Sequence, residues 1–66
     1  MLITLNGDRY EAAGPLTITE LLSRLGVDPR RVAVERNLVV LKRDAFPTTR
    51  IGDGDAIEIV NFVGGG

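Results

Sequence analysis

The sequence predicts an α+β fold, in which a mixed β-sheet of four to five strands packs on one helix that crosses one of its faces. Two observations lead to this prediction. Short segments rich in β-forming residues stand before and after residues 16–27, whose apolar residues recur at helical spacing. A helix between a strand pair and further strands must cross the sheet and bury its apolar side there. The 66 residues suffice for one domain with a small core.

The N-terminal segment predicts a β-hairpin. Residues 1–5 (MLITL) are apolar and favour a strand, and residues 9–13 (RYEAA) can form the returning strand. Between them, Asn6-Gly7 is the strongest short-range signal for a two-residue hairpin turn. Gly14-Pro15 then ends the second strand.

Residues 16–27 (LTITELLSRLGV) predict the helix. Thr17 and Glu20 have the spacing of a capping box, in which the hydroxyl and the carboxylate satisfy each other's backbone amides. Gly26 supplies the left-handed residue that closes the helix. A helix of about two turns is marginal by itself, so it must be stabilised by packing on the sheet. The stripe that packs there consists of Ile18, Leu21, Leu22 and Leu25.

The second half of the chain predicts three more strands. An irregular segment, in which a single helical turn near residues 44–46 fits, separates the last two strands. In order, the expected elements are a turn at 28–31, a strand at 32–35, a short connection at 36–37, a strand at 38–43, the irregular segment at 44–55 and the last strand at 56–63.

This order of elements is the β-grasp arrangement, best known from ubiquitin. We expect a β-grasp domain over residues 1–63 and a flexible glycine tail over 64–66. Val60 and Phe62 alternate with Ile57 and Ile59, so they belong on the open face of the sheet. The predicted core consists of Met1, Ile3, Leu5, Ile18, Leu21, Leu22, Leu25, Val32, Val34, Ile57 and Ile59.

The composition excludes several kinds of chemistry. The chain has no cysteine and no histidine, so disulfides, thiolate metal sites and the usual catalytic triads are ruled out. Eight basic and nine acidic residues leave no basic excess for nucleic acid. No apolar run is long enough for a membrane span, and the N-terminus does not resemble a signal peptide. We therefore expect a cytoplasmic protein that binds neither nucleic acid nor membrane.

Two groups of charged residues allow a functional and a structural interpretation. Asp53, Asp55 and Glu58 could hold a cation or act as acid and base, but "GDGD" is more typical of a turn. Five basic residues in the middle of the chain could dock an acidic partner, but a solvated face balanced by neighbouring acids is the preferred interpretation. They are Arg30, Arg31, Arg36, Lys42 and Arg43.

The last strand ends in three glycines, Gly64, Gly65 and Gly66. They could be disordered padding, a cloning remnant, or an arm that enters a narrow site on another protein. Glycine has no Cβ and accepts almost any backbone angle, so such an arm can pass through a tunnel that bulkier residues would block. Residues 63–66, fully extended, reach roughly 13 Å.

Two segments resemble the sulfur-carrier proteins of thiamin biosynthesis, a ubiquitin-like β-grasp family, and the resemblance extends over the whole chain. The segment "VAVERNLVVLKR" is similar to the family's middle segment, with Asn37, the aliphatic pair Val40 and Leu41, and Arg43. Lys42 departs from this pattern, because many members have a proline there, which would stiffen the strand edge.

The C-terminal segment "DGDAIEIVNFVGGG" carries the second part of the resemblance. It resembles the family signature of Asp53-Gly54-Asp55, an aliphatic strand and a terminal Gly65-Gly66. The chain length also agrees with the family.

The resemblance implies a chemical role for the C-terminus. An ATP-dependent adenylating enzyme, similar to the ubiquitin-activating enzymes, adenylates the Gly66 carboxylate. A sulfur donor, such as a persulfide-bearing protein, then converts it to a thiocarboxylate, and thiazole synthase receives the sulfur. On this interpretation the chain is a protein cosubstrate and not an enzyme, and it binds no cofactor or metal. Gly65 and Gly66 carry the sulfur, Gly64 gives access, and Val60, Phe62 and Val63 form a hypothetical partner surface.

Three alternatives remain open. The small subunit of molybdopterin synthase shares the fold, the tail and the activation chemistry, although the short segment after Gly26 favours the thiamin branch. A modifier joined to lysines through the same tail, or another sulfur carrier of this kind, is the second alternative. The third is a plain β-grasp interaction module whose tail has no function.

Overall fold

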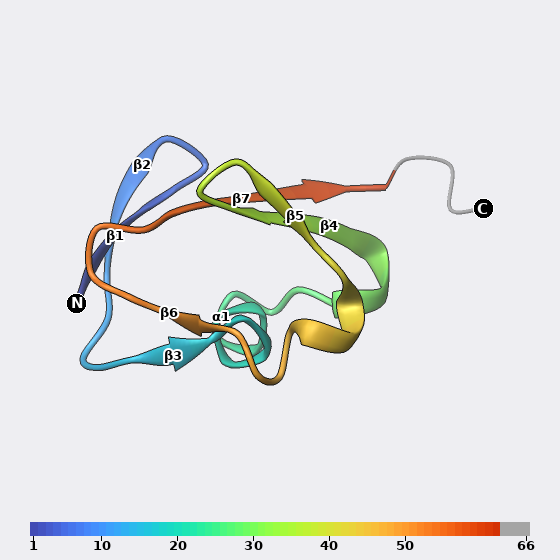
Figure 1. The fold of residues 1–66 in the computed structure, drawn as a ribbon, viewed down its shortest axis with the longest axis horizontal. Coiled ribbons are helices and arrows are strands. Elements are labelled where there is room, and N and C mark those ends of the chain that lie inside the picture. Colours follow the sequence, from blue (N-terminus) through green and yellow to red (C-terminus); the bar gives the residue numbers. More distant parts are fainter. Residues whose placement is uncertain (63–66) are drawn as a thin grey trace.

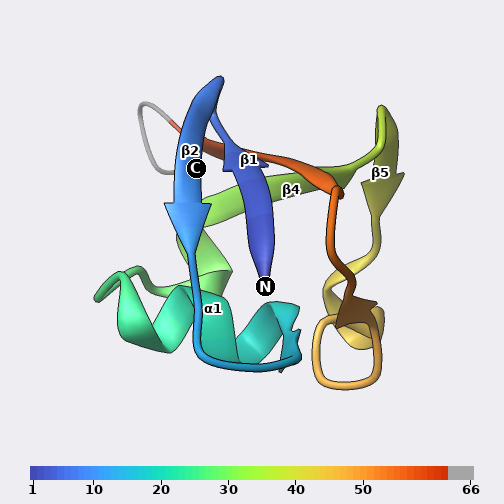
Figure 2. The same cartoon turned by 90° about the vertical axis from the view of Figure 1, so that its left-hand side faces the viewer.

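The computed structural model describes residues 1–62. It consists of a five-stranded mixed sheet with the helix α1 (Ile18–Arg24) on one face (Figures 1 and 2). The strand order is β2-β1-β7-β4-β5, in which only the central pair β1 and β7 is parallel. These strands are β1 (Leu2–Leu5), β2 (Asp8–Glu11), β4 (Val32–Arg36), β5 (Val39–Leu41) and β7 (Ala56–Asn61). The predicted β-grasp fold is confirmed.

The first hairpin forms with the predicted turn, and its second strand is Asp8–Glu11 instead of residues 9–13. Leu5 pairs with Asp8 across a two-residue turn, in which Asn6 and Gly7 have φ values of 48° and 85°. Positive φ at both positions is what a type I′ turn requires. The Asn6 side chain also accepts a hydrogen bond from the Ile59 amide at 2.7 Å and donates one to the Ile59 carbonyl at 3.2 Å. This turn is therefore fastened to the last strand.

Helix α1 begins and ends as the sequence indicates. The Glu20 amide donates to the Thr17 hydroxyl at 3.1 Å and the Thr17 amide donates to the Glu20 carboxylate at 2.8 Å, which completes the capping box. The hydrogen bond from Thr17 lowers the pKa of the Glu20 carboxyl. At the other end, Gly26 has φ 69°, and the amides of Gly26 and Val27 donate to the carbonyls of Ser23 and Leu22. This pattern is a Schellman motif.

The prediction that Leu25 belongs to the core is wrong. The helix ends at Arg24, and Leu25 is its C-cap, where the Schellman turn leads the chain away from the stripe. Its side chain is 36% exposed, and Val27, two residues later, packs against the core in its place.

A second, two-stranded sheet was not predicted. Strand β3 (Leu16–Thr17) pairs with β6 (Arg50–Ile51) beside the start of α1. Each strand has two residues, which is too short to leave a periodic pattern in the sequence. The pair carries Leu16 and Ile51 into the core, where Phe46 joins them.

Further details differ from the predicted boundaries. The connection between β4 and β5 is Asn37-Leu38, so β5 begins at Val39. The last strand ends at Asn61. Short 3₁₀ turns occupy Pro29–Arg31 and Arg43–Ala45, and the second agrees with the single helical turn expected near residues 44–46.

The core lies between α1 and the inner face of the sheet. Met1, Leu5 and Ile59, which were predicted to be core residues, are only partly buried at its margin. Within residues 1–62, no helix is long and apolar enough to cross a membrane. The buried residues are Ile3, Leu16, Ile18, Leu21, Leu22, Val32, Val34, Phe46, Ile51 and Ile57.

Candidate functional site

The central strand β7 leads the chain toward its C-terminus. It is held on one side by β1 and on the other by β4, with Val32 paired to Asn61. One residue beyond the strand, the Phe62 amide donates to the Arg31 carbonyl at 2.9 Å. The chain is therefore fixed to the body up to Phe62. Val63, Gly64, Gly65 and Gly66, predicted as surface and tail residues, lie outside the described residues.

Val60 and Phe62 lie where the sequence places them. Both are 55% exposed, on the sheet face opposite the helix, because side chains alternate along β7. In Figure 1 no helix or strand of residues 1–62 covers this outer face. The predicted exposure is confirmed, and the role of the two side chains in binding a partner stays a hypothesis.

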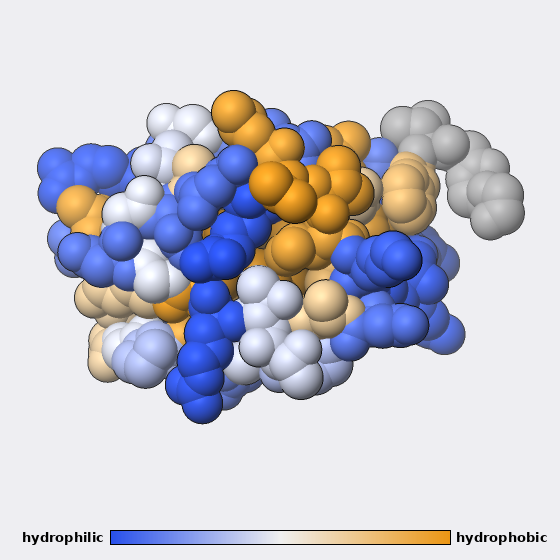
Figure 3. Space-filling view, in the orientation of Figure 1, coloured by the Kyte–Doolittle hydropathy of each residue, from blue (hydrophilic) through white to orange (hydrophobic). Residues whose placement is uncertain are grey.

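A second exposed apolar group was missed by the sequence analysis. Leu38, Val39 and Val40 are 83%, 62% and 67% exposed at the tip and along the edge of the β4–β5 hairpin. We call these three residues the hairpin patch. Figure 3 shows apolar surface over this hairpin that extends toward the end of β7. The signal that could have revealed it is the run of three aliphatic residues directly after the turn-forming Asn37.

A network centred on Asp55 holds the hairpin tip in place. The Asp55 carboxylate accepts hydrogen bonds from the Arg36 side chain at 2.9 Å, the Asn37 side chain at 3.1 Å and the Gly52 amide at 2.8 Å. Burial raises the pKa of this carboxyl, but the hydrogen bonds from Gly52, Arg36 and Asn37 outweigh that effect and lower the pKa below its usual range. Asn37 also accepts a hydrogen bond from the Ala56 amide at 2.9 Å.

The acidic residues near β7 form turn contacts. Besides the Asp55 network, the Asp53 carboxylate accepts a hydrogen bond from the Leu2 amide at 2.6 Å, and Gly54 has φ 84°. Glu58 lies on β7 and pairs across to Glu35 on β4. Within residues 1–62, no three acidic side chains come together as metal ligands. The positive φ of Gly54 and the hydrogen bonds between Asp55 and Gly52 confirm the turn interpretation of "GDGD".

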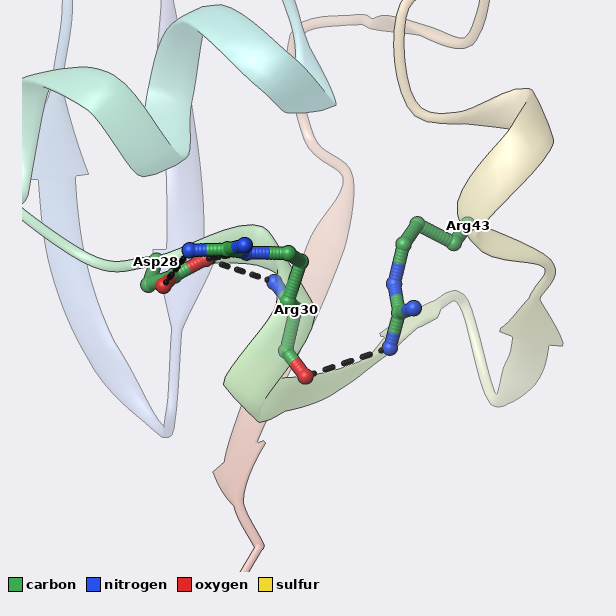
Figure 4. A network of polar contacts seen from close by, with 3 residues as sticks. All are labelled: Asp28, Arg30 and Arg43. Carbon is green, nitrogen blue, oxygen red and sulfur yellow. Dashed lines mark hydrogen bonds and ion pairs between the residues drawn. The ribbon is translucent and has the colours of Figure 1, made fainter.

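Arg30 and Arg43 are joined next to Arg31, whose carbonyl accepts the Phe62 hydrogen bond. Arg30 forms an ion pair with Asp28 at 3.1 Å, and Arg43 donates to the Arg30 carbonyl at 3.2 Å (Figure 4). The ion pair lowers the pKa of the Asp28 carboxyl and raises that of Arg30. The second described ion pair joins Arg36 to Asp55. Two of the five basic residues, Arg30 and Arg36, thus pair with neighbouring acids, and for the group as a whole the balanced face stays a prediction.

The outer face can contact a partner through Val60 and Phe62, which are both exposed on it. On the same face, Glu35 of β4 and Glu58 of β7 lie opposite each other across the two strands. A five-stranded mixed sheet that carries one helix, with the central strand leading toward the C-terminus, defines a ubiquitin-like protein of the β-grasp class.

Comparison with known proteins identifies the family. The ThiS family model matches residues 3–66. The crystal structure of a thiamine biosynthesis protein (ThiS) from Geobacter metallireducens superimposes with a TM-score of 0.88, at 46% identity and with 100% of both chains covered. The chain belongs to the ThiS family.

Two curated relatives differ in the share of their own length that this chain matches. It is 40% identical over 50 residues to the sulfur carrier protein ThiS of Bacillus subtilis, which covers 76% of each chain. It is also 42% identical over 66 residues to a thiazole synthase of Paramagnetospirillum magneticum. That match takes in 100% of this chain but only 20% of the relative, so the chain spans a fifth of the length of that protein.

Proposed function

We propose that the chain is a sulfur carrier for the biosynthesis of the thiamin thiazole. The observation that carries this proposal is the family match over residues 3–66, which includes the terminal glycines. Two further likenesses support it, namely the structure of the Geobacter metallireducens protein and the relative named sulfur carrier protein ThiS.

The chemistry takes place at the Gly66 carboxylate. A carboxylate is a poor electrophile, because with a pKa near ~3.5 it is anionic at neutral pH. An adenylating enzyme joins it to the AMP part of ATP and releases pyrophosphate. The terminal sulfur of a persulfide-bearing donor then displaces AMP and forms an acyl disulfide. A thiol attacks the donor's sulfur in that bond, which releases the thiocarboxylate and leaves a disulfide between the thiol and the donor.

Thiazole synthase is the proposed acceptor of this sulfur. The relative named thiazole synthase supports this partner, since it contains a segment similar to the whole of this chain. A thiocarboxylate is a soft nucleophile, and its tether to a docked protein raises its effective concentration in the acceptor's active site. No step requires an acid or base from this chain, which therefore acts as a cosubstrate and not as an enzyme.

The body and the tail have separate tasks in this proposal. Residues 1–63 form the domain that partners recognise, and residues 64–66 form the arm that reaches their active sites. Glycine suits the arm because it has no side chain to obstruct a narrow channel. The reaction uses ATP, and we place it in the cytoplasm.

Transfer of labelled sulfur tests the proposal. The chain is first loaded with radioactive sulfur by the adenylating enzyme, ATP and a sulfur donor, then purified and given to thiazole synthase with its other substrates. We expect the label to leave the protein and appear in the thiazole product. A chain that loads but never passes its label to thiazole synthase, and passes it instead to the large subunit of molybdopterin synthase, would contradict the thiamin branch.

A further inference from the structure

The two tight hairpins of the sheet differ at one position. Both turn through two residues with positive φ, Asn6 and Gly7 in the first and Asn37 and Leu38 in the second. Glycine suits the second position because it has no Cβ to crowd the backbone at positive φ. Leu38, at φ 70°, holds the same position with a large side chain. The β4–β5 turn therefore carries a conformational strain that the β1–β2 turn avoids.

The strained residue gains little burial in return. Leu38 is 83% exposed, more than any other large hydrophobic residue of the described chain. It opens the hairpin patch, in which Val39 and Val40 continue along β5, an edge strand. A run of exposed apolar residues on a sheet edge invites unwanted pairing, and proteins usually avoid it.

The opposite edge of the same sheet is protected. Strand β2 carries Asp8, Arg9 and Glu11, and charges of this kind prevent edge-to-edge association. The two edges of the sheet therefore differ, since β2 carries charged residues and β5 carries exposed apolar ones. Protection against edge-to-edge association explains the charged edge but not the apolar one, so the hairpin patch points to a contact outside the chain.

The hairpin tip is held rigidly for such a contact. The Asn37 amide donates to the Ala56 carbonyl at 2.8 Å, and its side chain bonds both Ala56 and Asp55. The adjacent Arg36 is fixed by its ion pair with Asp55. A side chain on a fixed support loses less conformational freedom on binding, which favours affinity.

The position of the patch indicates the size of its partner. The hairpin tip lies beside Ala56, at the start of β7, whereas Phe62 lies beyond the other end of that strand. The intervening residues span about 20 Å at the usual rise of a strand. Side chains alternate along β5, so Val40 shares the outer face with Val60 whereas Val39 points to the other face. A molecule that covers Leu38 and Val40 and also receives the tail must extend over the whole length of the outer face, as a folded enzyme does.

We propose that the hairpin patch is the docking anchor for thiazole synthase, and that Leu38 enters an apolar pocket of that enzyme while the tail occupies its active site. This inference rests on the proposed function. The choice of thiazole synthase rests on the Paramagnetospirillum magneticum relative, in which a segment similar to this chain belongs to the same polypeptide as the rest of a thiazole synthase. A domain in that setting has the synthase as its permanent neighbour.

The substitution Leu38→Gly separates binding from folding. Glycine relieves the strain at positive φ, so the variant should unfold at the same denaturant concentration as wild type or at a higher one. Loss of the anchor should weaken binding to thiazole synthase at least about tenfold, measured by calorimetry with the full 66-residue chain. Leu25→Gln is the matched control, because it removes another exposed leucine and should leave binding unchanged. Loading of the Leu38→Gly variant with sulfur by the adenylating enzyme should equal that of wild type.

Several results would overturn the proposal. If wild type binds thiazole synthase and Leu38→Gly binds equally well, the anchor is elsewhere while the proposed function stands. If the variant loses only its interaction with the adenylating enzyme, the patch belongs to that partner. If the substitution abolishes only a concentration-dependent self-association, seen by sedimentation, the patch joins two copies of this chain. If wild type itself fails to bind thiazole synthase, the docking proposal and the assigned acceptor fail together.

Discussion

Asp55 joins three parts of the chain through one carboxylate. It links the loop before β7, through the Gly52 amide, to Arg36 at the end of β4 and to Asn37 in the hairpin turn. Asn37 and Asp55 are two residues on which the resemblance to the sulfur-carrier family depends, and in the structure they are in direct contact. A structural role therefore accounts for both residues of the motif, because their contact fixes the hairpin next to the start of β7.

Asp55 should make the stability of the protein depend on pH in the acid range. Its pKa is lower in the folded chain than its ordinary value of 3.8, so the stabilisation is complete above that value and is lost as pH falls through the folded pKa. We expect Asp55→Asn to unfold at lower denaturant concentration than wild type at pH 7. The difference should shrink steadily below about pH 4. A difference that stays constant down to about pH 2 would show that ionisation of Asp55 does not contribute.

Thr17 allows a test of the helix start. Thr17→Ala removes the side-chain acceptor for the Glu20 amide and should lower the free energy of unfolding by about 1 kcal/mol, with the fold retained. Denaturant titration followed by circular dichroism measures this change. Ser23→Ala, at an exposed position inside the same helix, serves as the control and should have little effect. An unchanged midpoint for Thr17→Ala would mean that the cap contributes nothing.

At the scale of elements, β7 contributes to the core on one face of the sheet and exposes apolar side chains on the other. Its inward residue Ile57 is buried under the helix, whereas Val60 and, just beyond the strand, Phe62 face outward. Strand β7 is paired with both β1 and β4 at its start, whereas its end is held by β4 up to the backbone contact between Phe62 and Arg31. The apolar surface next to the tail is therefore held through β4.

Phe62→Asp tests whether this surface binds partners. Phe62 is 55% exposed, so the substitution should leave the unfolding midpoint nearly unchanged. A charge placed in an apolar interface should weaken binding to the adenylating enzyme or to thiazole synthase. Thr48→Asp adds the same charge at an exposed loop position away from β7 and should bind as wild type does. A large loss of stability with unchanged affinity per folded molecule would contradict the interface and assign Phe62 to packing.

Elements specified by neighbouring residues could be predicted from the sequence. The capping box, the Asn6-Gly7 turn and the closing Gly26 depend only on residues that are close in the sequence. Their patterns could therefore be recognised from the sequence, and the structure confirms them. The pairing of Leu16 with Ile51 depends on residues far apart in the sequence, and two-residue strands show no periodicity. Leu25 continues the helical stripe in the sequence, but the Schellman turn removes it from the helix.

The candidate site was predictable in part for the same reasons. Alternation along β7 gave the exposure of Val60 and Phe62. The hairpin patch could not be inferred, because the turn was placed one residue early and Leu38 then appears as an ordinary strand residue. Its exposure follows from the edge position of β5, which only the order of strands in the sheet reveals.

At the scale of the whole molecule, the proposed function assigns recognition to the body and the chemistry to the end of the chain. The sheet has one face filled by the helix and another that residues 1–62 leave uncovered (Figure 2). The chain contains neither histidine, the commonest general base, nor cysteine, whose thiolate is a strong nucleophile. If the chain is a sulfur carrier as proposed, the terminal carboxylate is the reactive group and the outer face selects the enzymes that act on it.

The intact mass of the protein tests the sulfur-carrier role most directly. Wild type is incubated with the adenylating enzyme, ATP and a sulfur donor, beside a variant that lacks Gly66 and the variant Gly65→Val. All three should unfold alike, since the core and the hydrogen bonds of residues 1–62 contain neither of the altered residues. Wild type should gain the mass of one oxygen exchanged for one sulfur, located on Gly66, whereas the deletion shortens the arm and the branched side chain obstructs the channel, so neither variant should gain it. A wild type that is never thiocarboxylated, or a deletion variant that is modified as fast as wild type, would contradict the sulfur-carrier role.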